Sequence, residues 1–82
     1  MGNEEIVSML DSIIRDRGVP RNIRSSLEES IIILNGDRSI TEKISHIISI
    51  LDDASTDSNI SSYTRINIWN LMSALEGMKN SV

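Results

Sequence analysis

The sequence contains no cysteine and no phenylalanine, and only Tyr63 and Trp69 are aromatic. Without cysteine, a disulfide framework, a thiolate metal site and thiol redox chemistry are all excluded. Because aromatic residues are so scarce, the core must come from Ile, Leu, Val and Met, which suit interlocking helices. We expect the 82 residues to form a single domain, 1–82, with little surplus stability.

The sequence also lacks long apolar runs and an excess of positive charge. No stretch of about 18 apolar residues exists, so no membrane-spanning helix is expected. Residues 1–5 have neither the basic nor the apolar region of a signal peptide. The net charge is −4, whereas dedicated nucleic-acid binders are usually basic. We therefore expect a cytoplasmic protein without a membrane partner.

Groups that support catalysis are missing as well. His46 is the only histidine, and no serine lies in the Gly-x-Ser-x-Gly pattern of a nucleophile elbow. The segment Asp57–Ser61 begins like a calcium loop, but Ser62 and Ile68 replace the required Gly and Glu. We therefore expect a protein that is not an enzyme and that holds no metal or cofactor.

Four segments carry apolar residues at the spacing of an amphipathic helix. Each stripe recurs at intervals of three and four residues, so its side chains share one face. Ile66 and Trp69 lie to one side of the fourth stripe. The predicted stripes are Ile6, Met9, Leu10, Ile13 and Ile14; Ile23, Leu27, Ile31 and Leu34; Ile40, Ile44, Ile47, Ile48 and Leu51; and Ile68, Leu71, Met72 and Leu75.

Residues typical of helix starts precede these stripes. Asn3 and either Ser61 or Ser62 are suited to N-cap positions, and Ser39–Glu42 has the form of a capping box. Pro20 stands where the second helix should begin, since its missing N–H costs nothing there.

Glycines are expected to end the helices. Gly18 should end the first helix by taking a positive φ. Gly36 and Gly77 should end the second and fourth helices, which would leave residues 78–82 as a frayed tail.

The stretch Asp16–Arg24 returns forty-one residues later as Asp57–Arg65, with the Asp, an aliphatic residue and the Arg in register. The glycines that follow the second and fourth stripes recur at the same interval. Chance similarity between helices would give aliphatic matches, but less readily the same Asp, Arg and Gly. We interpret the pattern as a duplicated two-helix unit, with repeat 1 over about 3–36 and repeat 2 over about 39–77.

A two-helix unit of this length, with an Asp at the corner and an aliphatic–Arg pair, resembles the HEAT repeat family. Ile23-Arg24 is such a pair, whereas Thr64-Arg65 departs from it by one residue. The resemblance implies an all-α fold in which four helices form two tandem HEAT-like hairpins. Two units are too few for a solenoid, so we expect them to close into a compact bundle.

A closer resemblance covers nearly the whole chain. The motifs Val19–Arg24, Ile48–Asp52 and Ile68–Asn70 are similar to those of uncharacterised protein family number 0147, whose members are small archaeal proteins. That family usually has Pro where this chain has Ser61, which implies a looser second corner. The resemblance implies an all-helical fold but no activity and no functional residues.

The recurring corner residues have a structural interpretation and a functional one. We prefer the structural one, because an Asp at a helix corner accepts backbone N–H groups. We predict a ladder in which one of these Asp residues contacts an Arg across the interface between the repeats. The ladder consists of Asp16, Arg24, Asp57 and Arg65.

Three further arginines, Arg15, Arg17 and Arg21, are not supported by the repeat. Together with Arg24 they place four of the chain's eight basic residues within ten positions. The cluster suits an anion or an RNA phosphate at the start of the second helix. The alternative, which we prefer, is a solvated corner balanced by acidic neighbours, namely Asp11, Asp16, Glu28 and Glu29.

Ile66 and Trp69 make the fourth helix apolar on a second face. They stand where the first repeat has Ser25 and Glu28. Trp69 is either packed into the core, as most Trp residues of small domains are, or part of an interaction surface. We prefer the core for Trp69.

These patterns favour a non-enzymatic interaction module that binds another protein or a second copy of itself. The candidate surface consists of Arg15, Arg17, Arg21, Ile66 and Trp69. The alternative is an RNA- or ribosome-associated accessory protein that uses the Arg15–Arg24 corner.

Overall fold

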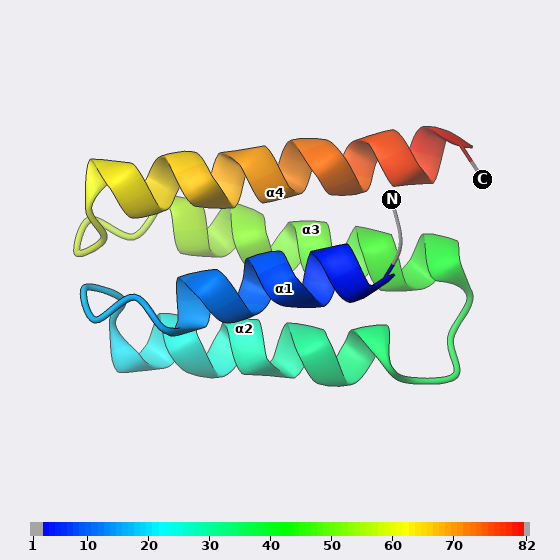
Figure 1. The fold of residues 1–82 in the computed structure, drawn as a ribbon, viewed down its shortest axis with the longest axis horizontal. Coiled ribbons are helices and arrows are strands. Elements are labelled where there is room, and N and C mark those ends of the chain that lie inside the picture. The colour runs from blue at the N-terminus through cyan, green and yellow to red at the C-terminus, as the bar shows by residue number, and fades with distance from the viewer. Residues whose placement is uncertain (1–2, 82) are drawn as a thin grey trace.

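The computed structural model describes residues 3–81 of the chain, which form four α-helices (Figure 1). The described residues contain no strand. The all-α class and the number of helices were therefore predicted correctly. The helices are α1 (Asn3–Ile14), α2 (Arg21–Leu34), α3 (Ile40–Ser55) and α4 (Ser62–Ser81).

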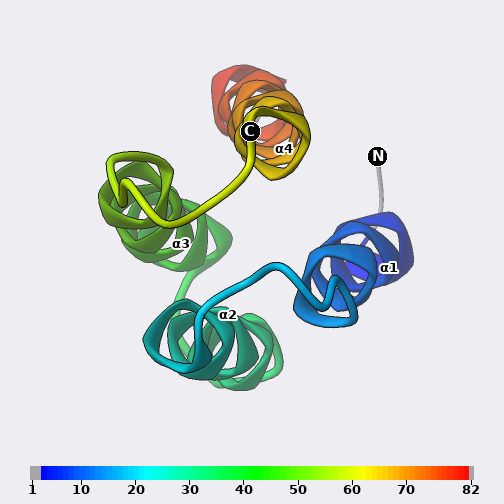
Figure 2. The same cartoon turned by 90° about the vertical axis from the view of Figure 1, so that its left-hand side faces the viewer.

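The helices run up and down and close into a ring (Figures 1 and 2). Each helix packs on the next, and α1 also packs on α4, while α1 and α3 lie on one diagonal and α2 and α4 on the other. The seam between α3 and α4 is the most extensive, and that between α1 and α4 the least. The α1–α2 and α3–α4 corners lie together at one end of the bundle, and the α2–α3 connection lies at the other (Figure 1).

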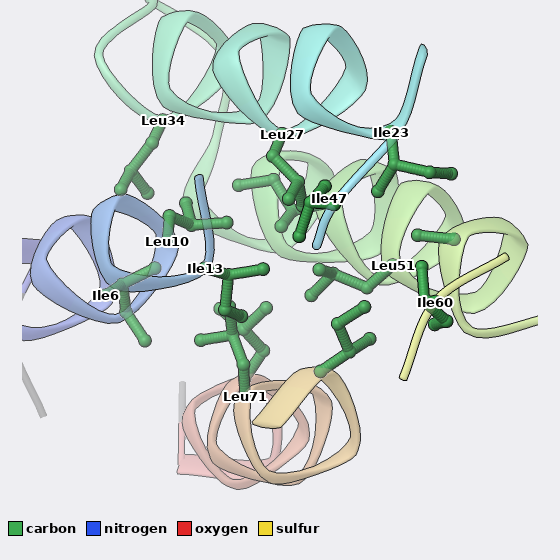
Figure 3. Close-up of a cluster of buried hydrophobic side chains, with 14 of the residues drawn as sticks. Ile6, Leu10, Ile13, Ile23, Leu27, Leu34, Ile47, Leu51, Ile60 and Leu71 are labelled. Atoms are coloured by element: carbon green, nitrogen blue, oxygen red, sulfur yellow. The ribbon is translucent and has the colours of Figure 1, made fainter. Parts of the chain in front are cut away.

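The core fills the centre of this ring and is entirely aliphatic (Figure 3). The predicted stripes supply most of it, and their outer members, such as Met9 and Ile48, are half-buried at its margin. Val19 and Ile60 come from the two corners and close the core at that end. The buried apolar residues are Ile6, Leu10, Ile13, Val19, Ile23, Leu27, Leu34, Ile44, Ile47, Leu51, Ala54, Ile60, Ile68, Leu71 and Leu75.

Three polar residues, Ser30, Ser55 and Thr64, are buried beside the core. The hydroxyls of Ser30 and Ser55 donate to backbone carbonyls of their own helices, at 3.2 and 2.8 Å. Within the described residues no buried polar side-chain atom lacks a hydrogen-bond partner. These groups therefore avoid the cost of unpaired burial.

The helix starts follow the predictions closely. The Ser39 hydroxyl accepts the N–H of Glu42 at 3.2 Å, and the Ser61 hydroxyl accepts the N–H of Thr64 at 3.1 Å. Pro20 is the N-cap of α2, with φ −58° and ψ 153°, so this helix begins one residue later than predicted. Asn3 opens α1, but its side chain lies outside the part that the structure describes.

The predicted role of the glycines is wrong at two points. No described glycine has a positive φ, so Gly18 does not end α1 in the way expected. Gly77 does not end α4, which continues to Ser81. The predicted frayed tail is therefore helical over residues 78–81, and Val82 lies outside the described residues.

Packing explains why α4 continues past its glycine. Met78 extends the inward positions of Leu71 and Leu75 by one more turn and is half-buried against the core. Lys79 lies in the last turn, where a positive charge is favoured by the helix dipole. These contacts outweigh the low helix propensity of Gly77.

Gly77→Ala should therefore stabilise the protein by about 0.5–1 kcal/mol, because Ala loses less backbone entropy in a helix. A Cβ at this position meets nothing within 4 Å. The free energy of unfolding from urea denaturation measures the gain.

Gly36→Ala is the matched control. Its Cβ would lie 3.3 Å from the carbonyl oxygen of Ile33, so it should stabilise the protein less than Gly77→Ala does. A Gly77→Ala protein no more stable than the parent would contradict the role assigned to Gly77.

Candidate functional site

The two corners are built on an Asp that caps its own turn. The Asp16 carboxylate accepts the N–H of Gly18 at 2.9 Å, and the Asp57 carboxylate accepts the N–H of Asn59 at 2.7 Å. Both bonds span two residues, the geometry of an Asx turn. The prediction that these residues accept backbone N–H groups is confirmed.

Each corner is also closed by an Arg that binds the end of the preceding helix. Arg24 donates from Nε to the carbonyl of Ile14 at 3.1 Å, and Arg65 donates from Nε to the carbonyl of Ser55 at 2.9 Å. Those carbonyls belong to the last residues of α1 and α3, where the helix dipole favours a cation. The Nη2 atoms add bonds to the carbonyls of Asp16 and Asp57, at 3.4 and 3.0 Å.

The predicted Asp–Arg contact across the hairpins is wrong, because the structure joins them by a different pair. The Thr64 hydroxyl, at the start of α4, donates to Oδ2 of Asp16 at 2.6 Å. The guanidinium groups of Arg24 and Arg65 are already occupied by carbonyls. A buried Thr therefore makes the cross-link that was assigned to an Arg.

The surroundings of Asp16 favour its charged form. The Thr64 hydroxyl first, and then the N–H of Gly18, hold the pKa of Asp16 below its ordinary value, while partial burial works in the opposite direction. Stability linked to this carboxylate is therefore present above about pH 4 and is lost as the pH falls through the lowered pKa.

The second corner lacks the counterpart of this bond. Ile23 occupies the place in α2 that Thr64 occupies in α4, so it has no hydroxyl to offer. Ile23 and Asp57 nevertheless line the same hollow, of about 290 Å³, between α2 and α3. Ser61 supports this corner instead, because its hydroxyl caps the start of α4. The equivalent residue at the start of α2 is Pro20, which makes no side-chain cap bond.

An equivalent hollow of about 330 Å³ lies between α1 and α4. Tyr63 at its edge replaces Asn22, which lines the other hollow. The α1–α4 hollow thus has an aromatic residue at its rim. Its lining residues are Ser8, Met9, Ser12, Ile13, Tyr63, Asn67 and Asn70.

The three candidate arginines lie at the corner end of the bundle. Arg15 pairs with Asp11 at 2.9 Å in an exposed ion pair, which contributes little to stability. Arg17 and Arg21 are exposed, and neither has an ion-pair partner within the described residues. Two positive charges of the cluster are thus open to solvent.

The core position expected for Trp69 is wrong. Its side chain is 53% exposed, and that of Ile66 is 51% exposed. Ile68, Leu71 and Leu75 take the inward positions of α4, and the residue after Ile68 points about 100° away from it. Trp69 therefore lies on the outer surface of the bundle.

Sequence reasoning missed two other exposed apolar residues, Tyr63 at 71% and Ile32 at 72%. Tyr63, Ile66 and Trp69 follow one another at intervals of three on the outer face of α4. The predicted repeat offered a signal for their exposure, because the residues forty-one positions earlier are polar and exposed. Those counterparts are Asn22, Ser25 and Glu28.

The structure does not bring the five candidate residues into one patch. Arg21 opens α2, which lies diagonally across the bundle from α4. Ile66 and Trp69 face outward from α4, about one and two turns after its start at Ser62. Arg21 and the apolar face of α4 therefore lie on two separate surfaces.

The part of the chain that the structure describes has neither a group of metal ligands nor a membrane-spanning helix. Over residues 3–81, no three His, Cys, Asp or Glu side chains are grouped as metal ligands. The same part of the chain has no helix both long and apolar enough to cross a bilayer. His46 lies on α3, and its Nδ1 accepts a bond from Arg38 at 3.2 Å.

Comparisons with known proteins agree on one family. The model of the uncharacterised protein family UPF0147 matches residues 3–78. A UPF0147 protein of Methanothermobacter thermautotrophicus is 42% identical, over 96% of this chain and 81% of the relative. One from Methanosarcina acetivorans is 45% identical over 88% and 75%, and one from Sulfurisphaera tokodaii is 38% identical over 94% and 88%. No solved structure matches the chain.

Asp16→Asn should destabilise the protein by about 1–2 kcal/mol at pH 7, because it removes a charged acceptor from the Thr64 hydroxyl. Asp57→Asn is the matched control, and it should cost less because Asp57 accepts only the N–H of Asn59. Urea denaturation of both variants measures the difference.

The same pair of variants also tests the pH dependence. The stability difference between the parent and Asp16→Asn should shrink as the pH falls below about 4, where the carboxylate becomes protonated. The role given to Asp16 would be contradicted if the two variants lost the same free energy of unfolding at pH 7. It would also be contradicted if the stability difference between the parent and Asp16→Asn did not change with pH.

Ile23→Thr should create at the second corner the bond that the first corner has. Replacing a buried Ile costs stability, but part of the loss should return when the new hydroxyl donates to Asp57. A double-mutant cycle with Asp57→Asn should therefore give a coupling of about 1 kcal/mol. Zero coupling would show that the two corners are not equivalent.

Proposed function

The chain belongs to the uncharacterised protein family UPF0147, and from that premise we propose that it is a non-enzymatic, cytoplasmic interaction module. Its contact surface is the outer face of α4, and its partner is a protein. The scaffold consists of two tandem HEAT-like hairpins, residues 3–36 and 39–77, that close on each other. The observation that carries the proposal is the exposure of Trp69 in a chain with only one Trp.

The recurring corner contacts support the scaffold. In both hairpins an Asp caps the turn and an Arg, eight residues on, binds the end of the preceding helix. Val19 and Ile60 are buried at equivalent positions. The ring differs from a stacked array, in which equivalent helices would be neighbours, because here α1 and α3 lie diagonally across the core from each other. This difference is expected for two units that must bury their apolar faces against each other.

The composition of the α4 face supports binding of a protein. An exposed Tyr or Trp presents an apolar body with a polar end, and Trp and Tyr are enriched at binding hot spots. The hollow beside Tyr63, between α1 and α4, makes this face concave at its edge, unlike a flat helix surface. The face can therefore receive an apolar side chain of a partner.

The other surface supports a second candidate, an RNA- or ribosome-associated function. Arg17 and Arg21 are exposed, and neither has an ion-pair partner among residues 3–81, as phosphate contacts require. Arg21 has no exposed aromatic residue beside it for base stacking, since within the described residues the exposed aromatics lie on α4, diagonally opposite α2. We therefore place this function second.

Capture of partners by the immobilised protein tests the proposal. The parent and Ile32→Glu should retain the same partner from an archaeal extract, and Trp69→Glu should lose it. Ile32 is a suitable control, because it is an exposed apolar residue on α2, away from α4. Binding through the α4 face should survive roughly 0.5 M salt. At that ionic strength, interactions between exposed charges are largely screened.

Two outcomes would count against the α4 face. Retention of the same proteins by all three baits would contradict the proposal. Retention of RNA that high salt releases, and that Arg17→Ala/Arg21→Ala abolishes, would favour the second candidate.

A further inference from the structure

The outer face of α4 differs from the rest of the surface in its charge. Between Ser62 and Leu75 the only charged residue is Arg65, and its guanidinium is bonded to the carbonyls of Ser55 and Asp57. Exposed carboxylates are present on each of the other helices. They include Glu4 and Glu5 on α1, Glu28 and Glu29 on α2, and Asp52 and Asp53 on α3.

This distribution favours one kind of partner. Two copies of a chain with net charge −4 repel each other when their acidic faces approach. Their α4 faces can meet over residues 62–75 without opposing carboxylates. Over residues 62–75 of this face, a basic partner would find no acidic group to pair with, and an acidic partner would find only the occupied Arg65. The uncharged part of this face does not repel a copy of itself, whereas the acidic faces of two copies repel each other.

The spacing of the exposed residues is also symmetric. Tyr63 and Trp69 each lie three residues from Ile66. In an antiparallel pair of α4 helices related by a two-fold axis at Ile66, the two Ile66 side chains meet. Tyr63 of each copy then lies at the level of Trp69 of the other. Such an isologous contact uses the same patch on both copies.

The hollow between α1 and α4 fits this arrangement. Asn67 and Asn70 lie on the side of α4 that faces α1, where they line the hollow together with Met9. The two-fold axis brings Tyr63 of the second copy to the level of these residues. Met, Asn and Ser side chains suit a phenol, because sulfur contacts the ring and amides or hydroxyls bond the O–H.

The exposed area suits a small interface. A Tyr or Trp side chain buries about 150–250 Å², so with Ile66 the three residues present on the order of 300–400 Å² per copy. That is within the range of the largest apolar patch on a typical monomer, about 300–600 Å². A standard interface takes about 800 Å² per partner. The remainder would come from uncharged flanking residues such as Ser62 and Ser73.

We infer that the α4 face binds a second copy of this chain, giving an antiparallel dimer with Ile66 on its two-fold axis. The inference rests on the proposed function and specifies its partner. Because the apolar area is modest, we expect the dimer to be weak, so that the dimeric fraction rises with protein concentration.

Cross-linking through a single cysteine tests the dimer and its register. The parent has no cysteine, so Ile66→Cys has one thiol, placed on the axis, where the Cβ atoms can approach the roughly 4 Å that a disulfide needs. Ile32→Cys is the matched control, with one exposed thiol on α2. Under mild oxidation, Ile66→Cys should form the disulfide dimer about tenfold faster, because pairing raises the effective thiol concentration.

Sedimentation of the parent provides the second measurement. The mass should rise from 9.2 kDa toward twice that value with concentration, and Ile66→Glu should stay at the monomer mass. A parent that is monomeric throughout, or an Ile66→Cys protein that cross-links no faster than Ile32→Cys, would overturn the inference. If a different protein is still captured through Trp69, the proposed function stands and only the self-association fails.

Discussion

The bond from the Thr64 hydroxyl to the Asp16 carboxylate, at 2.6 Å, fixes how the two hairpins meet. Apolar burial holds the bundle together, but aliphatic side chains alone do not specify one arrangement of four helices, since burial has no direction. A charged hydrogen bond does have a direction, and it is costly to leave unmade beside a core. It sets α4 beside the first corner, along the seam where the helices pack least.

The ring has an approximate two-fold symmetry that this bond breaks. Rotation about the bundle axis would exchange α1 with α3 and α2 with α4, and most hydrogen bonds of Asp16 and Arg24 have counterparts at Asp57 and Arg65. The hollow between α1 and α4 becomes the hollow between α2 and α3. The bond from Thr64 to Asp16 has no counterpart at the second corner, because Ile23 occupies the position equivalent to Thr64 and has no hydroxyl. One seam is therefore fixed by a polar bond and the other by apolar contact, which lets the two surfaces of the bundle differ.

The same asymmetry extends to the outside of the protein. Polar residues on the outer face of α2 are replaced on α4 by Tyr63, Ile66 and Trp69, at positions that the scaffold leaves exposed. None of the three is needed to fill the core, which is already complete without them. Exposed aromatic side chains raise the risk of aggregation, so their presence on an otherwise charged surface supports an interaction role. The arginine corner has a weaker case, because Arg15 is already paired and the other two are only solvated.

The sequence by itself determined the helices, their inward faces and the Asp that caps each corner turn. These features depend on contacts within about ten residues, which spacing and capping chemistry report directly. Only the tertiary structure decided that Thr64, and not an Arg, reaches Asp16, because that contact spans forty-eight residues. It also placed Trp69 outside and continued α4 beyond Gly77, since both outcomes depend on which positions the other three helices cover. A side chain's hydrophobicity is encoded locally, but its burial is a property of the neighbours that the fold brings to it.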